Sequence, residues 1–251
     1  MILNKKNAEM EKMLNPLNQF LVRPFNLDLF YCNISVTNST LAFLITYLII
    51  LLFTRIISTK ISLIPSRMQA CGETIFLMID NILISTAGQN TRQFFTLIFS
   101  FFMFILVSNS IGMIPFIFTT TSHIQVTFVL AIFVFITITI TGFVKNGIKY
   151  FSILLPQGTP IFLAPLMIII ELFAYLARPI SLSIRLAANV TAGHVVLKVL
   201  ASFVILSGFF GIMPFILLTI LTGFEIFVSV LQAYVFSILT CAYLNSALNV
   251  H

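Results

Sequence analysis

The sequence predicts an all-α, polytopic membrane protein with about five membrane-embedded helices and one amphipathic surface helix. The last two membrane-embedded helices are predicted to be long and oblique and to form a hairpin. Of the 251 residues, 59% are hydrophobic and only 8% are charged, and the mean hydropathy is +1.11. A soluble domain of this size carries about a quarter charged residues. The chain is therefore expected to face lipid, where helices rather than open sheets satisfy the backbone.

Three apolar stretches have the length of one membrane crossing, which takes about 20 residues. They cover residues 38–57, 94–118 and 124–144. The third contains a run of β-branched residues that favours strand in water, but the absence of water in the bilayer favours helix. Residues 1–37 mix charges with short apolar runs and have no long apolar core, so we expect an extramembrane tail rather than a signal peptide.

An amphipathic helix is predicted for residues 62–90. Apolar residues alternate there with Arg67, Glu73 and Asp80, and the two acids are seven residues apart, which places them on nearly one helix face. We expect this helix to lie on the inner surface of the membrane.

The last two apolar stretches, residues 160–206 and 212–248, are about twice as long as a perpendicular crossing requires. The helices there are expected to be strongly tilted or broken. We predict an oblique hairpin that turns at Gly208, Gly211 and Pro214.

Basic residues in short loops mark the inner side of a membrane. They follow the first span, precede the second and follow the third, whereas residues 115–122 carry no charge. The N-terminus is then expected outside and the C-terminus inside. This scattering also explains the net charge of +6 better than nucleic-acid binding, because the sequence has no basic stripe.

Chemistry on a covalent bond is not indicated, and no cofactor or metal is expected. Cys32, Cys71 and Cys241 are odd in number and far apart, without the paired spacing of a zinc or redox site. A glycine-rich phosphate loop and a nucleophile elbow are both missing from the sequence.

Ionisable residues inside the long apolar stretches are the candidate functional groups, because each costs about 3 kcal/mol or more at mid-membrane. They are Glu171, Arg178, Arg185, His194 and Lys198 in the first stretch, and Glu225 with the polar Gln232 in the second. Both stretches are therefore expected to carry polar stripes on facing helices.

Helical spacing orders these residues around Arg185. Glu171 and Arg178 precede it at intervals of seven, which drift by only about 20° per step. Asn189 lies one turn beyond Arg185 on the same side, and His194 lies on roughly the opposite face. Glu225 and Gln232 are also seven apart.

The chemistry of these side chains suggests a proton path. Arginine stays charged and cannot relay protons, but Arg185 can attract a carboxylate of a neighbouring subunit and favour its deprotonated form. Buried and paired Glu or His side chains can exchange protons near neutral pH. Glu171, about 21 Å of helix before Arg185, is expected on an inner access path. His194, about 14 Å past Arg185, and Glu225 are expected to share the outer path.

Two runs around these residues resemble the ATP synthase subunit a family. The first is Arg178-Pro-Ile-Ser-Leu-Ser-Ile-Arg185-Leu-Ala-Ala-Asn189-Val-Thr-Ala-Gly193-His194, and the second is Phe224-Glu225-Ile-Phe-Val-Ser-Val-Leu-Gln232-Ala-Tyr-Val-Phe. Pro65-Ser66-Arg67 and Asn109-x-x-Gly112-x-x-Pro115 fit the same family. The resemblance runs from about residue 38 to the C-terminus.

The resemblance implies a non-catalytic, proton-conducting stator of an F-type ATP synthase. It would supply two offset half-channels beside a ring of c subunits, with Arg185 as the essential arginine, Glu225 as the channel acid and Gln232 as the final-helix glutamine. Partners would be the ring, the peripheral stalk, other membrane-sector subunits and the lipid bilayer, but no nucleic acid. The Gly193-His194 pair with Glu225 resembles the mitochondrial pattern, which implies the mitochondrial inner membrane, with a bacterial plasma membrane as the alternative.

Other interpretations remain open from the sequence. Arg185 could pair structurally with Glu171 or Glu225, His194 could be a packed core histidine, and Asn189 and Gln232 could only join helices. An ion-coupled secondary transporter or channel also needs ionisable residues at mid-membrane, although transporters commonly show internal repeats and none is visible here. A membrane scaffold without transport would not need these charges.

Overall fold

The computed structural model describes residues 20–22, 24–26, 35–59, 65–114, 117–154, 162–206 and 211–248. Six helices among these residues are long and apolar enough to cross a membrane, which confirms the all-α, polytopic class. Most of the predicted N-terminal tail, and Gly208 of the predicted turn, lie outside the described residues.

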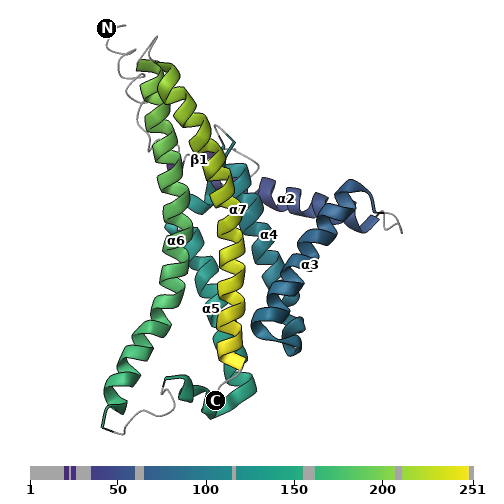
Figure 1. Cartoon of the computed structure of the whole chain (residues 1–251), viewed down its shortest axis with the longest axis vertical. Helices are drawn as coiled ribbons and strands as arrows, with labels where there is room; N and C mark the ends of the chain where they lie inside the picture. Colours follow the sequence, from purple (N-terminus) through teal and green to yellow (C-terminus); the bar gives the residue numbers. More distant parts are fainter. Residues whose placement is uncertain are drawn as a thin grey trace.

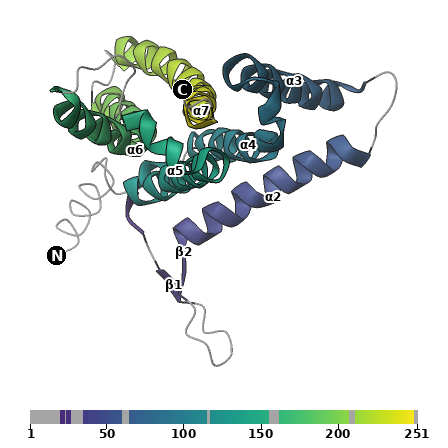
Figure 2. The ribbon, with the colours of Figure 1, turned by 90° about the horizontal axis from the view of Figure 1, so that it is seen from below.

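A short β-ribbon precedes the first long helix and was not predicted. Strand β1 (Pro24–Asn26) pairs antiparallel with β2 (Ser35–Thr37). Helix α2 (Asn38–Thr59) begins directly after β2, where Thr40 Oγ1 accepts a hydrogen bond from the backbone N–H of Thr37 at 2.9 Å. Figures 1 and 2 show that α2 lies across the direction of the other long helices.

Helix α3 (Arg67–Ala87) is shorter than the predicted segment 62–90. Its start is capped by Ser66, whose side chain accepts a hydrogen bond from the N–H of Gln69, and it ends at Gly88, whose φ of 88° favours glycine. The helix is amphipathic, with a buried face toward α4 and α7. It is also apolar enough to cross a membrane, so its place on the inner surface stays a prediction.

Helices α4 and α5 both pack against α7, and three short 3₁₀ helices precede, separate and follow them. The elements are η2 (Gln89–Phe94), α4 (Phe95–Gly112), η3 (Thr120–Ser122), α5 (Ile124–Asn146) and η4 (Gly147–Leu154). Helix α4 ends six residues before the predicted limit of 118, three residues ahead of Pro115, whose ring disfavours continuation of the helix. Helix α5 confirms that the β-branched run 132–140 is helical in this protein.

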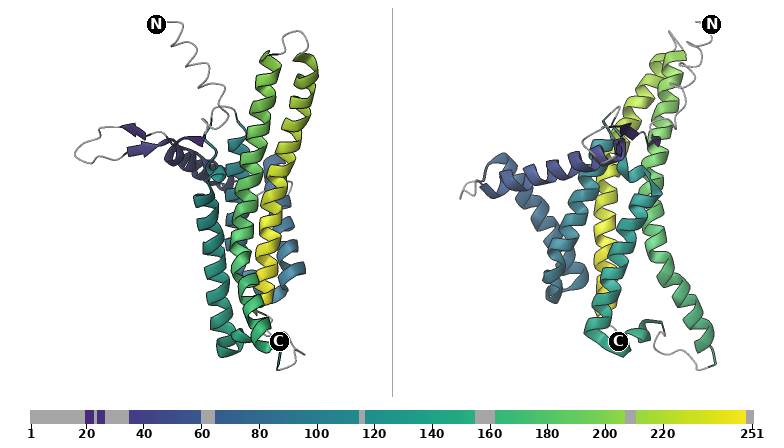
Figure 3. Two further views of the ribbon diagram at one scale, coloured as in Figure 1. Left: turned by 90° about the vertical axis from the view of Figure 1, so that its left-hand side faces the viewer. Right: turned by 180° about the vertical axis from the view of Figure 1, so that it is seen from behind.

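The two C-terminal helices, α6 (Ala164–Leu206) and α7 (Ile212–Leu248), are long and run side by side as an antiparallel pair (Figures 1 and 3). The bounds of α7 agree with the predicted 212–248, whereas α6 ends at the predicted residue 206 but begins at Ala164 rather than at residue 160. Helix α7 contacts α3, α4, α5 and α6 and is the centre of the fold. The fully buried side chains around it include Leu83, Ile98, Ile105 and Phe236.

Candidate functional site

Arg185 lies in the middle of α6 and is exposed. Its neighbours Leu182, Ser183, Leu186 and Ala187 are buried against the bundle, so α6 is packed on that side. Arg185 makes no hydrogen bond or ion pair with any residue that the structure describes. The site therefore presents a free cation on an outward face of the hairpin.

That outward face is strongly apolar. Ile180 and Ile184 of α6, near Arg185 in the sequence, are 47% and 50% exposed, and Phe224 and Phe227 of α7 are exposed too. An arginine that faced only lipid here would be costly, because the hydrocarbon offers no counter-charge. The geometry suits a neighbouring protein surface that brings a carboxylate.

One helical turn beyond Arg185, a side-chain hydrogen bond joins the two long helices. Asn189 Nδ2 donates to Gln232 Oε1 at 3.0 Å. Gln232 is only 2% exposed, and its Nε2 has no partner in the described part of the chain. The amide of Gln232 is thus fixed by α6 through its oxygen while its NH₂ group can bind water or another ligand.

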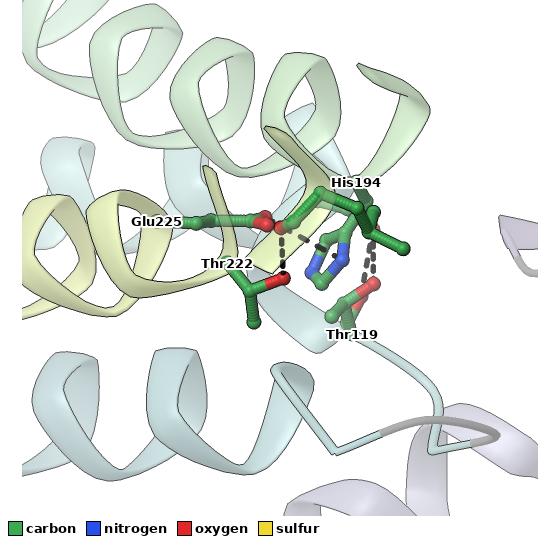
Figure 4. A network of polar contacts seen from close by, with 6 residues as sticks. Thr119, His194, Thr222 and Glu225 are labelled. Carbon is green, nitrogen blue, oxygen red and sulfur yellow. Dashed lines mark hydrogen bonds and ion pairs between the residues drawn. The ribbon is translucent and has the colours of Figure 1, made fainter. Parts of the chain in front are cut away.

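The next pair along the hairpin is His194 on α6 and Glu225 on α7. Their side chains point toward one another, with Thr119 and Thr222 close by (Figure 4). The distance between His194 Nδ1 and Glu225 Oε1 is 3.5 Å, and Glu225 is 9% exposed. Both groups can gain and lose a proton, so the pair can store or transfer one.

Gly193 allows the two helices to approach at this point. A Cβ atom at residue 193 would lie 2.6 Å from Glu225 Oε1 and 2.8 Å from its Cδ. Only a residue without a side chain leaves the Glu225 carboxylate in this position. The Gly193-His194 sequence therefore has a steric explanation.

Several unpartnered polar atoms converge on one small cavity beside this pair. The buried atoms without a hydrogen-bond partner in the described residues include Asn109 Oδ1, Glu225 Oε1 and Oε2, Ser229 Oγ and Gln232 Nε2. All four residues line the same cavity, together with Asn189 and His194. It has room for about one water molecule, to which these unpartnered atoms can hydrogen-bond. Buried polar groups without partners are costly, so water is the expected occupant.

Asn109 and Ser229 were not predicted as site residues from the sequence. Asn109 is buried in α4, and its Nδ2 donates to the backbone oxygen of Ser229 at 3.5 Å. The available signal was an amide in the apolar helix 95–112, but nothing in the sequence connected residue 109 with residue 229. Only the packing of α4 against α7 brings them together.

Glu171 lies near the opposite end of α6. Its Oε1 is 3.7 Å from Arg178 NH2, and both side chains are about a quarter exposed. The spacing of seven therefore places these two together, but the third member of the stripe, Arg185, stays apart. Within the described residues Glu171 pairs with Arg178 and Glu225 with His194, so neither carboxylate neutralises Arg185.

A metal site is not indicated by the side chains that the structure describes, since they contain no group of three or more His, Cys, Asp or Glu residues. Cys71 is exposed and Cys241 is buried, and both are free thiols.

Comparison with protein families gives one match over most of the chain. The family model described as "ATP synthase A chain" matches residues 40–245. This range runs from the third residue of α2 to Asn245 in α7 and includes every candidate site residue from Asn109 to Gln232. The chain belongs to the ATP synthase A chain family, the proton-conducting stator of the membrane sector that assembles beside the c-ring.

Proposed function

We propose that this chain conducts protons through two offset aqueous half-channels, and that Arg185 between them deprotonates the carboxylate of each passing ring subunit. The observation that carries this proposal is that Arg185 is exposed and unpaired among the described residues, on an apolar face. A guanidinium in such surroundings requires an opposite charge. A carboxylate carried by the ring supplies it and loses its proton, because a nearby cation favours the charged form of an acid.

The outer half-channel is formed by the His194–Glu225 pair and the cavity beside it. Asn109, Ser229 and Gln232 line this cavity, and their unpartnered atoms can hold the water that carries a proton away from Glu225. The Asn189–Gln232 hydrogen bond leads from the cavity to the turn that bears Arg185. Protons can then pass from the membrane surface to the ring through side chains and water alone.

The inner half-channel begins near Glu171. This residue lies 14 positions before Arg185 on α6, which is about 21 Å of helix. Its carboxylate remains partly exposed beside Arg178, so it can exchange protons with an aqueous path. Glu171 is therefore the group that accepts protons released from the ring on this side.

The arrangement of the helices supports an oblique position of the hairpin in the membrane. With 43 and 37 residues, α6 and α7 are about 65 and 55 Å long, whereas the hydrocarbon core is about 30 Å thick. Helix α2, with 22 residues, has the length of one perpendicular crossing. It lies apart from the hairpin and runs crosswise to its direction (Figures 1 and 2). If α2 stands upright, α6 and α7 run obliquely along the membrane, where they can follow the surface of the ring.

The orientation follows from the basic loops. We place the N-terminus outside and the C-terminus inside, in the matrix of a mitochondrion, with the chain in the inner membrane. A protease-accessible tag at the C-terminus on the outer side of sealed organelles would contradict this orientation.

The test is ATP-driven proton pumping by the intact complex with Arg185→Ala. We expect pumping to be lost while the complex still assembles and hydrolyses ATP once uncoupled. A matched control is Arg55→Ala, because Arg55 is an exposed arginine of α2 outside the hairpin. Near-normal pumping by Arg185→Ala, at a complex yield equal to that of the control, would show that Arg185 is structural.

A further inference from the structure

The first arm of α6, residues 164–178, has no buried side chain that packs it against the rest of the protein. All buried residues of α6 lie between Pro179 and Ala187. Pro179 lies inside the helix and has no N–H to donate to the carbonyl of Tyr175, which weakens the helix at this point. Figures 1 and 3 show the arm diverging from α5 and α7 beyond this region. The arm carries Glu171, so its angle decides where that carboxylate lies.

Three hydroxyl groups tie the arm to the bundle at the weak point. Tyr175 OH lies 2.6 Å from Thr139 Oγ1 of α5 and 2.8 Å from Tyr150 OH of η4. Thr139 Oγ1 donates its proton to the carbonyl of Phe135 at 2.7 Å. We name Thr139, Tyr150 and Tyr175 the tyrosine clasp.

The proton inventory of the clasp shows that it is structural. Each hydroxyl has one proton to donate, and that of Thr139 is used on Phe135. Tyr175 must therefore donate to Thr139, and Tyr150 must donate to Tyr175. The chain of bonds has a single direction and ends on a backbone carbonyl, so it can hold the arm but cannot conduct protons.

Arg178 is fixed at the same point. Its guanidinium carbon lies 5.2 Å from the centroid of the Tyr175 ring and 5.2 Å from that of Tyr243 on α7. A guanidinium within about 6 Å of an aromatic ring is attracted to its face, and here two rings from different helices hold it. The same guanidinium reaches back to Glu171 at 3.7 Å.

We propose that Arg178 is a positioning residue for Glu171, and that the tyrosine clasp together with Tyr243 holds Arg178 and the first arm of α6 against the bundle. The inference rests on the role proposed above for Glu171 in the inner half-channel. The clasp fixes the angle at Pro179, Arg178 fixes the carboxylate, and the distance from Glu171 to Arg185 is thereby set. Lysine cannot replace Arg178 in this role, because it has the charge but lacks the planar group that stacks on two rings.

The experiment measures the position of the arm and proton pumping in the same ATP synthase complex. Spin labels are placed at Phe162 and Ile148, which are 93% and 88% exposed, after replacement of the native cysteines. The variants are Tyr150→Phe, Tyr175→Phe, Arg178→Lys and Arg178→Gln. The control is Tyr47→Phe, because Tyr47 of α2 is 62% exposed and lies outside the clasp.

An interhelical hydrogen bond in a membrane protein shifts an equilibrium by about threefold. Tyr150→Phe loses one bond of the clasp and Tyr175→Phe loses two, so the ratio of held to released arm should fall about threefold and about tenfold. The distance distribution should broaden in that order, and pumping should decrease with it. Tyr47→Phe should change neither. Gly142→Ala should also broaden the distance distribution and decrease pumping, without altering a polar group, because the added methyl would overlap with the ring of Tyr150.

An unchanged distance distribution in both Tyr175→Phe and Arg178→Gln would overturn the clasp. Pumping by Arg178→Lys at the wild-type rate would overturn the positioning role, since charge alone would then suffice. Failure of the proposed function would give a different result. Glu171→Gln would then pump normally, and Arg178 would have no carboxylate of the proton path to position. The label distances would still respond to the clasp variants.

Discussion

Replacing Gly193 with alanine should perturb the proposed proton path without removing any polar group. The added Cβ would lie 2.6 Å from Glu225 Oε1, whereas ordinary contacts begin at 3.4 Å. The carboxylate must therefore retreat by the difference, about 0.8 Å. It is the flexible end of a side chain, so it gives way before the helices do. Alanine is a better helix former than glycine by about 1 kcal/mol, so the fold should not be weakened.

The expected result is a loss of rate with normal assembly. Glu225 Oε1 now lies 3.5 Å from His194 Nδ1, and a misplacement of about 1 Å in a reacting geometry can cost roughly a hundredfold. We expect Gly193→Ala to slow proton flux roughly tenfold to a hundredfold. The assay is ATP-driven acidification of sealed vesicles, followed with a pH-sensitive dye and normalised to the amount of assembled complex.

Gly223→Ala is the matched control, because it is the same substitution two residues from Glu225. A Cβ at Gly223 meets nothing within 4 Å, so this variant should pump like the unmodified protein. Equal pumping by the two alanine variants would refute the reasoning, since the contact with Glu225 would then have no part in proton transfer.

Three further predictions concern the cavity and the packing around it. Gln232→Leu should reduce pumping about tenfold, because it removes the hydrogen bond to α6 and the free NH₂ group that faces the cavity. Asn109→Leu should also slow pumping about tenfold by excluding water from the cavity, whereas Ser110→Ala, at the exposed neighbouring position, should have no effect. Thr127→Val breaks the buried hydrogen bond to Ser183 and should destabilise the complex by only about 0.6 kcal/mol. We expect a small decrease in the melting temperature of the complex in detergent and no change in proton pumping per assembled complex. Normal proton flux in Gln232→Leu or Asn109→Leu would contradict the proposal that the cavity belongs to an outer half-channel.

Much of the fold could be predicted from hydropathy, because lipid imposes a simple rule on length and composition. The predicted 212–248 agrees with α7, and 160–206 differs from α6 only at its start. The prediction was wrong where the apolar run and the helix end at different places, as at α4, which stops at Gly112 although apolar residues continue. Hydropathy indicates whether a residue lies in lipid or in water, whereas the end of a helix depends on local backbone preferences, such as those imposed by a proline.

The contacts within the site could be predicted only where the residues share one helix, or where the family resemblance already pairs a residue of α6 with one of α7. Helical spacing brought Glu171 and Arg178 together, and the structure places them 3.7 Å apart. Helical spacing could not show that Arg185, seven residues further along the same stripe, has no hydrogen-bond or ion-pair partner among the described residues. Asn109 was missed as a site residue for a similar reason, since its contact with Ser229 crosses 120 residues and depends on how α4 packs on α7.

The positions of the two acids on α6 and α7 explain why such a protein needs a moving partner. Glu171 and His194, the partner of Glu225, are 23 residues apart on α6, which is about 35 Å of helix. A proton step spans one hydrogen bond of about 3 Å, and no described chain of hydrogen bonds crosses that distance. Arg185 lies between the two ends and repels a proton that approaches it. In the proposed mechanism a proton therefore passes from one half-channel to the other on a carrier that travels past Arg185. A ring carboxylate that is neutral in lipid and charged beside the arginine suits this role. If the free arginine were paired within this chain, by a carboxylate introduced three residues later at Ala188 for example, the carrier would lose its counter-charge. Ring rotation should then stop, although both proposed half-channels would remain intact.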